Sequence, residues 1–385
     1  MASDEQRGGS GAGTGRDFDA PIKGTQRDAH RLADGLASWV SRRVAGGADV
    51  AVTSLETPGG TGVANETILF DATWRGDGKD QRARLVARLA TDSPLYLDAD
   101  IEQHFQMYAA LADEPVPVPR VLGYEPDVAL LGAPFFVMER IDGLVPPDQP
   151  HYSEQGWVVD ATPTERRRLW EDAVAVMSRL HLVDPAKLGF LDASGETGTT
   201  GLERCLSYWR RYHAWAAAGR SHEALDTAAE WLTANLPAAS PTAPAWGDAR
   251  VCNMIFRDFR CVAVLDWDTV SLAGGESDVA WWILMDRGAA DRLPGIGTFD
   301  ELVDQWEAHT GWQARDLHYH LVFAAYRLAA ILMRLFAQMA GRGLMAPEQA
   351  EHLSMHSTQA QQLALLLGLT PPDPVTATLP KLQRL

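Results

Sequence analysis

The chain has 385 residues, of which 46% are hydrophobic and 22% charged, and it carries a formal net charge of −17 at pH 7. This length is enough for two lobes that each bury a core, and the composition is that of a soluble globular protein. The strong negative charge argues against a nucleic acid or an anionic membrane as a partner.

Cysteine usage and the N-terminus bear on the cellular compartment. Cys205, Cys252 and Cys261 show neither metal-ligand spacing nor an even-numbered disulfide framework, so we interpret them as free thiols in a reducing compartment. The N-terminus lacks an apolar leader core, and no run approaches the roughly 18 apolar residues that a membrane span needs. We therefore expect a cytoplasmic protein. Its oligomeric state is unknown at this level.

The first part of the chain predicts a β-rich lobe. Residues 1–21 are rich in Gly, Ser, Asp and Thr and are expected to be disordered. Apolar spacing then alternates between helical and strand periods, with a turn at residues 76–78. The expected elements are a helix at 25–44, strands at 49–55, 67–74 and 82–89, a helix at 98–112, and strands at 118–124 and 134–141. We assign residues 22–142 to this N-terminal lobe.

The second part of the chain predicts a mainly helical lobe, residues 143–370, followed by a tail, residues 371–385. A Pro-rich stretch at 144–150 marks the connection between the two lobes. The expected helices lie at 165–182, 201–218, 222–235, 277–287, 299–309, 315–341 and 347–367. The sequence therefore predicts an α+β, bilobal architecture, with a β-rich lobe followed by a helical lobe.

Two short segments of the helical lobe carry residues suited to phosphoryl transfer. Asp248 is followed five residues later by Asn253, and Asp266 ends a short apolar run eighteen residues after Asp248. In phosphoryl transfer one carboxylate accepts the proton of the attacking hydroxyl, while an amide oxygen and a second carboxylate hold Mg²⁺ on the phosphates. The spacing Asp-x₄-Asn is that of the kinase catalytic loop, and Asp266 takes the place of the aspartate in the D-F-G motif.

Each of these residues also has a plainer interpretation. An aspartate after a glycine is by itself more often a turn residue or helix cap, and Asn253 could bond its own loop backbone. Asp266 ends a buried strand, where a carboxylate needs either a metal or an arginine partner. The three residues at these offsets favour catalysis, with Asp248 as the catalytic base and with Asn253 and Asp266 as metal ligands.

The sequence leaves the roles of the residues next to these three more open. Asp268 either assists the metal or acceptor or braces its loop, and we include it among the metal ligands. Arg250 either steadies the catalytic loop or touches phosphate, and we group it with the catalytic residues. Asp278 is expected to cap a helix that begins near Val279. Most of the 13 tryptophans are expected to pack between helices, and one or two to line an acceptor pocket.

With these residues in view, the chain resembles the aminoglycoside phosphotransferase family, within the protein-kinase-like fold. It is most similar to actinobacterial phosphotransferases and to the kinase-like domain fused to some acyl-CoA dehydrogenases. The resemblance extends over about residues 25–368 and rests on segments 65–70, 115–119, 132–139, 246–253 and 264–268. One departure is Trp246, which stands where many relatives have histidine. That residue is mostly scaffolding, so we expect the chemistry to survive and the local packing to change.

The resemblance implies a nucleotide site between the lobes. The Gly-rich segment 58–65 is expected to cover the phosphates, through Gly60, Thr61, Gly62 and Asn65. Arg88 replaces the β3 lysine of protein kinases, and its guanidinium keeps the charge and can grip phosphate bidentately. Strand alternation places Arg82 and Arg84 on the same face as Arg88, so the pattern alone does not single it out.

Two further parts of the nucleotide site follow from the resemblance. The helix at 98–112 should supply a partner for Arg88, either Glu102 or His104, and we favour Glu102. The strand that ends in Met138, Glu139, Arg140 and Ile141 should be the interlobe hinge, whose backbone would pair with adenine.

The function implied is a Mg²⁺-dependent small-molecule O-phosphotransferase that uses ATP or GTP. The acceptor would be an aminoglycoside-like or other hydroxylated metabolite, because kinship at the level of the fold does not fix the substrate. The alternatives are a kinase for a hydroxylated acyl or natural-product substrate, and a nucleotide-binding protein without transferase activity.

Overall fold

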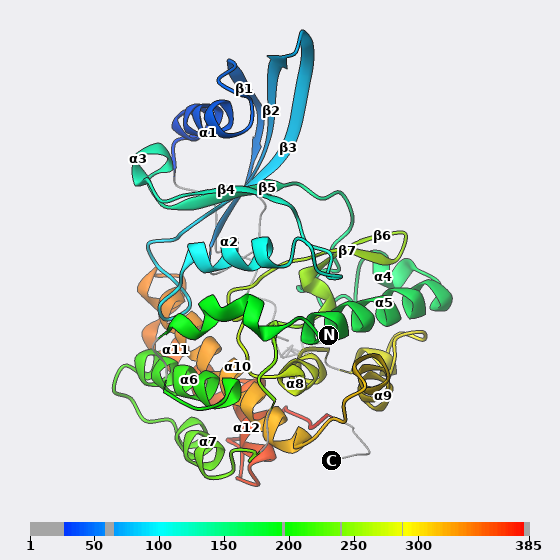
Figure 1. Ribbon diagram of the computed structural model, residues 1–385. Helices are drawn as coiled ribbons and strands as arrows, with labels where there is room; N and C mark the ends of the chain where they lie inside the picture. Colours follow the sequence, from blue (N-terminus) through cyan, green and yellow to red (C-terminus); the bar gives the residue numbers. More distant parts are fainter. Residues whose placement is uncertain (1–26, 58–64, 195–196, 239–240, 287, 381–385) are drawn as a thin grey trace, which may run out of the picture.

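The structure is a computed structural model that describes residues 27–57, 65–194, 197–238, 241–286 and 288–380. Two lobes are stacked on one another, with a sheet and a covering helix in one and most of the helices in the other (Figure 1). This is the expected bilobal, protein-kinase-like layout. The predicted disordered segment 1–21 and the glycines of the phosphate-covering segment lie outside the described residues.

The first lobe is built on one antiparallel sheet with the strand order β1-β2-β3-β5-β4. Its strands are β1 (Val50–Glu56), β2 (Glu66–Gly76), β3 (Lys79–Leu89), β4 (Val121–Glu125) and β5 (Phe135–Glu139). Strands β2 and β3 form a tight hairpin in which Gly76 pairs with Lys79. The two turn residues, Asp77 and Gly78, both have positive φ, which suits the twist of a two-residue hairpin. The turn expected at this point is confirmed.

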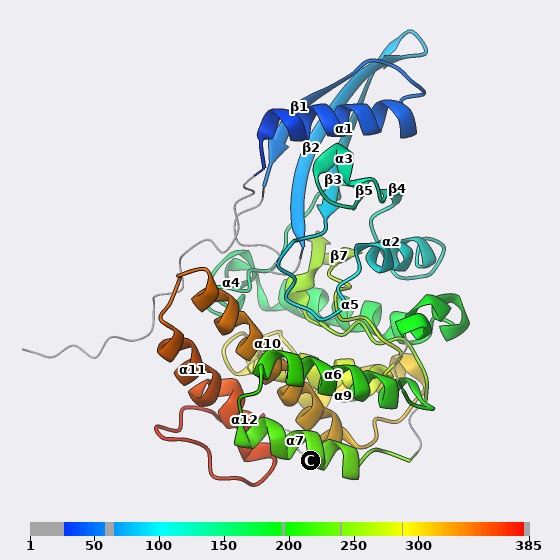
Figure 2. The same cartoon turned by 90° about the vertical axis from the view of Figure 1, so that its left-hand side faces the viewer.

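Helices cover the two faces of this sheet. Helix α1 (Ala29–Arg43) packs Leu36 and Trp39 into an apolar cluster that includes Phe70 and Phe135. It begins four residues later than predicted, because the Asp28 side chain accepts a hydrogen bond from the Arg31 backbone and caps the helix there. Helix α2 (Ile101–Ala110) lies between the sheet and the helical lobe (Figures 1 and 2). A short helix, α3 (Val128–Leu131), was not predicted.

The second lobe is mainly helical, with one small hairpin, β6 (Met254–Arg257) and β7 (Arg260–Val264). Its helices are α4 (Trp157–Asp160), α5 (Pro163–His181), α6 (Gly201–Ala217), α7 (Glu223–Ala234), α8 (Gly275–Asp286), α9 (Phe299–Thr310), α10 (Leu317–Gly341), α11 (Pro347–His356) and α12 (Thr358–Leu366). The single helix predicted at 347–367 is wrong. The chain is extended at Ser357, whose side chain caps α12 through the Ala360 backbone.

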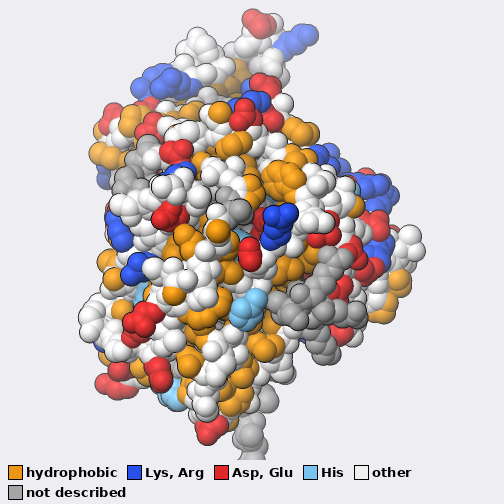
Figure 3. Space-filling view, turned by 60° about the horizontal axis from the view of Figure 1, so that its bottom comes forward, with side chains coloured by type: hydrophobic (Ala, Val, Ile, Leu, Met, Phe, Trp, Pro, Cys, Tyr) orange, Lys and Arg blue, Asp and Glu red, His pale blue; other side chains and the backbone are white. Residues whose placement is uncertain are grey.

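Helix α10 forms the centre of this lobe. It contacts α6, α7, α8, α11 and α12. In its most apolar 18-residue stretch, 72% is buried inside the protein. Its length and a mean hydropathy of 1.5 over that stretch would also suit a membrane span, although Arg327 and Arg334 interrupt its apolar residues. Burial on all sides explains the apolar composition of a core helix. On the face of the molecule in Figure 3, acidic and basic side chains are interspersed with apolar ones.

The segment between β3 and α2 is fastened to the helical lobe. The hydroxyls of Tyr208 and Tyr212 on α6 donate to the carbonyls of Leu97 and Leu95, each at 2.9 Å. On α10, Gln338 Nε2 donates to the Pro94 carbonyl at 2.8 Å. Side chains of the helical lobe therefore position the segment that leads into α2.

Candidate active site

A buried carboxylate binds the backbone of the loop that carries Asp248. Asp278 accepts hydrogen bonds from the backbone N–H groups of Trp246 at 2.6 Å and Gly247 at 2.8 Å. It also accepts one from His181 Nε2 at 2.9 Å. The prediction that Asp278 caps a helix near Val279 is wrong. Helix α8 begins earlier, at Gly275, and the fully buried Asp278 satisfies donors of a loop distant in sequence.

Trp246 connects this loop to the segment that carries Asp266. Its indole Nε1 donates to the carbonyls of Leu265 and Asp266 at 2.9 and 3.0 Å. The departure from the family's histidine thus has a definite structural consequence, because the side chain bridges two loops that each carry a predicted site residue.

Gly247 leaves no room for a side chain. Its φ is +91°, and a Cβ built there would lie 2.1 Å from the Thr269 carbonyl oxygen. We expect Gly247→Ala to lower the free energy of unfolding by several kcal/mol, because backbone must move on either side of the clash. Gly311→Ala is the matched control, since Gly311 also has positive φ but nothing within 4 Å of its Cβ position, and it should cost only about 1–2 kcal/mol. Equal losses in urea denaturation would contradict this account.

The Asp248 carboxylate is held on both oxygens. Asn253 Nδ2 donates to Oδ2 at 2.8 Å and to the Asp248 carbonyl at 3.0 Å. Trp281 Nε1, on α8, donates to Oδ1 at 2.7 Å. Arg250 Nε lies 3.0 Å from the same oxygen, and Arg250 also pairs with Asp148 at 2.9 Å. Of the two roles left open for Arg250, steadying the catalytic loop is the one that these contacts favour.

Asn253 presents its amide oxygen away from Asp248. A carboxylate only accepts hydrogen bonds, so the contact with Asp248 identifies the donating end of the amide. Among the described residues, Oδ1 accepts no hydrogen bond, although Asn253 is only 9% exposed. An oxygen of this kind suits a hard cation.

Asp266 occupies a strained and electrostatically unfavourable position. Its φ is +64°, in the left-handed region that few residues other than glycine adopt. Burial raises the pKa of Asp266 well above its ordinary value, and the neighbouring carboxylates of Asp268 and Asp248 raise it further. A bound cation would reverse this by favouring the ionised form. The strain and the crowding of negative charge both mark this residue as a functional candidate.

Asp268 is surrounded by donors. Its Oδ1 accepts from Asn65 Nδ2 at 2.8 Å and lies 3.2 Å from His104 Nε2, while Oδ2 lies 3.6 Å from Arg88 Nη2. Burial alone would raise the pKa of Asp268, but the His104 imidazole and the Arg88 guanidinium hold it below its usual range. Both oxygens already have partners, which favours the bracing role over the alternative in which Asp268 binds the metal.

Arg88 and its partner differ in part from the prediction. Arg88 donates to Thr67 Oγ1 at 2.9 Å and, with its side chain 16% exposed, faces the site, whereas Arg82 and Arg84 pair with Asp71 and Asp142. The expected pair with Glu102 is absent from the described residues. Glu102 is exposed in the first turn of α2. His104 lies two residues on, about 200° around the helix, so only one of the two can face the site.

Of the predicted hinge residues, Met138 and Glu139 end β5, and Arg140 and Ile141 follow it. Met138 is buried and pairs with Val86 of β3, while the Glu139 side chain forms an ion pair with Arg120 at 2.5 Å. The Arg140 N–H donates to the Arg84 carbonyl at 2.9 Å. Among the hydrogen bonds of the described residues, none uses the Ile141 N–H. Of the phosphate-covering residues, Gly60, Thr61 and Gly62 lie outside the described part, and Asn65 contacts Asp268 as noted above.

Two residues near the predicted site were missed by sequence reasoning. One is Trp281, which donates to Asp248 but sits in an apolar helical stretch where its spacing resembles core. The other is Tyr96, whose pKa is raised well above its usual value by burial and then by the carboxylates of Asp248, Asp266 and Asp268. Its ring packs edge-on against Trp209 of α6, with the ring centroids 6.5 Å apart. No signal in the sequence distinguishes either residue from other buried aromatics.

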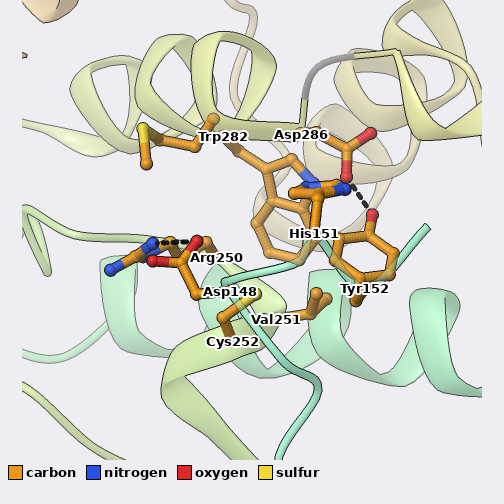
Figure 4. Close-up of a pocket in the computed structure, with 9 residues that line it drawn as sticks. Asp148, His151, Tyr152, Arg250, Val251, Cys252, Trp282 and Asp286 are labelled. Carbon is orange, nitrogen blue, oxygen red and sulfur yellow. Dashed lines mark hydrogen bonds and ion pairs between the residues drawn. The ribbon is translucent and has the colours of Figure 1, made fainter. Parts of the chain in front are cut away.

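A small cavity lies beside the predicted catalytic loop, and its lining includes Asp148, Tyr152, Arg250, Trp282 and Asp286. In Figure 4 the Tyr152 hydroxyl points at Asp286, to which it donates a hydrogen bond, and Asp148 faces Arg250. The stretch that connects the lobes is thereby fastened both to α8 and to the loop that carries Asp248 and Arg250.

Asp286 should make stability depend on pH. Burial raises its pKa from 3.8 to about 6, so the folded state binds this proton more tightly than the unfolded state. Its contribution to stability is complete below pH 3.8 and is lost as the pH rises through about 6. The loss is about 3 kcal/mol, since a tenfold change in proton affinity is worth about 1.4 kcal/mol. Asp286→Asn, which cannot ionise, should flatten this part of the curve. Superimposable curves of unfolding free energy against pH for the two proteins would contradict the assignment.

Comparison with known proteins identifies the family. The sequence pattern of the phosphotransferase enzyme family matches residues 63–338, well over half of the chain. The chain belongs to the phosphotransferase enzyme family. It is 29% identical over 251 residues to mouse acyl-CoA dehydrogenase family member 10, a match that covers 61% of the chain and 22% of that protein. The chain thus corresponds to less than a quarter of this relative's length.

Solved structures share the family's kinase-like fold. A putative aminoglycoside phosphotransferase from Ralstonia eutropha superimposes with a TM-score of 0.64 at 23% identity, covering 86% of this chain and 96% of that one. A thermostable mutant of aminoglycoside phosphotransferase APH(4)-Ia, solved with ADP and hygromycin B, gives a TM-score of 0.52 at 13% identity, with coverage of 86% and 98%. At these identities the likeness establishes the fold and leaves the substrate open.

Proposed function

We propose that this chain is a Mg²⁺-dependent kinase that transfers the γ-phosphoryl group of ATP or GTP to a hydroxyl of a small molecule. The observation that carries the proposal is the meeting of Asp248, Asn253 and Asp266, from two loops joined through Trp246, within a family of phosphotransferases. We assign nucleotide binding to residues 22–142 and the acceptor site to residues 143–370.

Asp248 acts as the base in this proposal. An alcohol sheds its proton as it attacks the phosphoryl group, and a fixed carboxylate accepts that proton. Trp281 and Arg250 both approach Oδ1, whereas Oδ2 accepts only the Asn253 hydrogen bond among the described residues. Oδ2 therefore keeps a lone pair for the proton of the acceptor hydroxyl. Arg250 keeps the loop in place through Asp148.

The donor set fits a magnesium site completed by phosphates. Among the described residues, no three His, Cys, Asp or Glu side chains are arranged to hold a metal ion by themselves. Mg²⁺ in kinases is bound through one or two carboxylates together with substrate phosphates, and the free Asn253 amide oxygen and Asp266 supply that smaller set. When bound there, Mg²⁺ would neutralise charge on the phosphates. Arg88 and Asn65 approach the same place from the other lobe.

The nucleotide would be held at the hinge. The backbone N–H of Ile141 is free of partners among the described hydrogen bonds and is suited to an adenine nitrogen. An aminoglycoside phosphotransferase of the same fold was solved with ADP, which supports nucleotide use here.

The acceptor would lie beside α6 and α8, because Trp281 of α8 touches Asp248 and Trp209 of α6 contacts Tyr96 with ring centroids 6.5 Å apart. The fold relatives suggest an aminoglycoside-like acceptor. Similarity to acyl-CoA dehydrogenase family member 10 favours a second candidate, a hydroxylated acyl compound.

A mass-spectrometric screen tests the proposal. The protein is incubated with Mg-ATP or Mg-GTP and a panel of aminoglycosides, hydroxylated acyl compounds and natural-product alcohols. We expect one acceptor class to gain a phosphoryl group only when nucleotide and Mg²⁺ are present. Thermal stabilisation by Mg-nucleotide without any phosphorylated acceptor would instead favour a nucleotide-binding protein that lacks transferase activity.

A further inference from the structure

A buried arginine lies behind the predicted catalytic carboxylate. Arg327, on α10, is 2% exposed, and none of the ion pairs among the described residues includes it. Its guanidinium carbon lies 4.6 Å from the ring centroid of Trp281 and 4.9 Å from that of Trp209. An isolated buried cation is costly, and contact with two indole faces offsets part of that cost.

Arg327 reaches Asp248 by two routes. Through its ring contact it fixes the plane of Trp281, whose Nε1 donates to Asp248 Oδ1 at 2.7 Å. Through Nη2 it donates to the Gly247 carbonyl at 2.7 Å, which fixes the peptide just before Asp248. Gly247 is held from its other side by Asp278. Both the backbone and the side chain of Asp248 are therefore restrained by groups of α8 and α10.

We infer that Trp281 and Arg327 are positioning residues for Asp248. The inference rests on the proposed function, since it assigns them to the same reaction. The Trp281 N–H holds one carboxylate oxygen, so that the carboxylate keeps one orientation toward the acceptor hydroxyl. The cation against the Trp281 face polarises the indole and strengthens its N–H as a donor. In this role neither residue binds the nucleotide or accepts a proton.

The kinetic test replaces Trp281 by Phe, which keeps the aromatic face and removes the donor. Loss of a hydrogen bond to a charged group should lower kcat about 10–100-fold, while the KM for nucleotide stays within about twofold. Trp282→Phe is the matched control. It removes an indole N–H from the next residue of the same helix, and none of the hydrogen bonds in the described part uses that N–H. It should leave kcat unchanged. Equal losses in the two variants, or a loss confined to nucleotide KM, would overturn the role of Trp281.

A spectroscopic test does not depend on turnover. In protein labelled with ¹⁵N at the tryptophan indoles, the Trp281 signal is the one that disappears in Trp281→Phe. We expect Asp248→Asn to move this signal upfield, because a neutral acceptor replaces a carboxylate, and to leave the Trp282 signal in place. If the chemical shift of the Trp281 indole N–H is the same in Asp248→Asn as in wild type, the inference is overturned even if the wild-type protein is an active kinase. If the expected shift is seen in a protein that phosphorylates nothing, the positioning contact stands and the proposed function fails.

Arg327 is tested through the same signal. Arg327→Met retains most of the volume and removes the charge, so it should shift the Trp281 signal and lower kcat although residue 327 does not touch Asp248. Arg327→Lys restores a cation and should recover part of both effects. Thermal melts identify any variant that fails to fold. Unchanged Trp281 resonance and kcat in folded Arg327→Met would show that Arg327 serves packing only.

Discussion

Asp248→Asn should lower kcat about 10²–10⁴-fold, the range associated with the loss of a general base. Asparagine fills the same space and its amide oxygen can still accept from Trp281 or Asn253, so the loop should keep its shape. Nucleotide affinity should stay within a few-fold of wild type, because Asp248 is not among the proposed phosphate or metal ligands. Steady-state kinetics and calorimetric titration of Mg-nucleotide measure the two quantities separately.

Two outcomes would contradict this account of Asp248. Turnover within a few-fold of wild type would exclude Asp248 as the base. A large loss of nucleotide affinity would move its role from the acceptor to the nucleotide. Asp160→Asn is a suitable control, because Asp160 is exposed on α4 and takes part in no ion pair among the described residues.

Asp266→Asn should have the second large effect. It should lower kcat but raise the stability of the nucleotide-free protein. Mg²⁺ contributes several kcal/mol of charge stabilisation in phosphoryl transfer, so weakening its ligand should lower kcat by about 10³-fold. The same change should stabilise the nucleotide-free protein, because burial and the adjacent Asp268 raise the pKa of Asp266 and make its ionised form unfavourable. Melting temperature with and without Mg-nucleotide provides the measurement.

The melting temperatures with and without Mg-nucleotide distinguish a metal ligand from a carboxylate that only stabilises the fold. The variant should melt higher than wild type without ligand and should gain less from Mg-nucleotide. A variant that melts lower in both conditions would mean that Asp266 stabilises the fold by itself. In that case the strained φ of Asp266 would need another explanation than metal binding.

The sequence predicted the parts of the fold that depend on local signals. The hairpin between β2 and β3 follows from Asp77 and Gly78, which accept positive φ at little cost. The start of α1 was misplaced because Asp28, an effective cap, lies inside the apolar pattern used to define the helix. The break between α11 and α12 was missed because it contains neither glycine nor proline. Ser357 stands at the break, and its side chain caps the second helix.

Contacts between distant segments could not be predicted in this way. Asp278 serves backbone donors more than thirty residues earlier, whereas local pattern suggests only a helix cap. The choice between Glu102 and His104 depends on the rotation of α2 about its axis, which the arrangement of the lobes decides. Trp281 gave no signal because a tryptophan that donates to a carboxylate and one that only packs look alike in sequence.

The central claim is that a phosphoryl group passes from nucleotide to a hydroxyl under the control of Asp248. The most direct measurement follows ATP labelled with ¹⁸O in its γ-phosphoryl group, with wild-type protein and Asp248→Asn side by side, using an acceptor found in the screen. We predict that the label appears in a phosphate ester of the acceptor with wild type, and far more slowly with Asp248→Asn. Equal rates of ester formation in the two proteins, or label recovered only as inorganic phosphate, would contradict the claim.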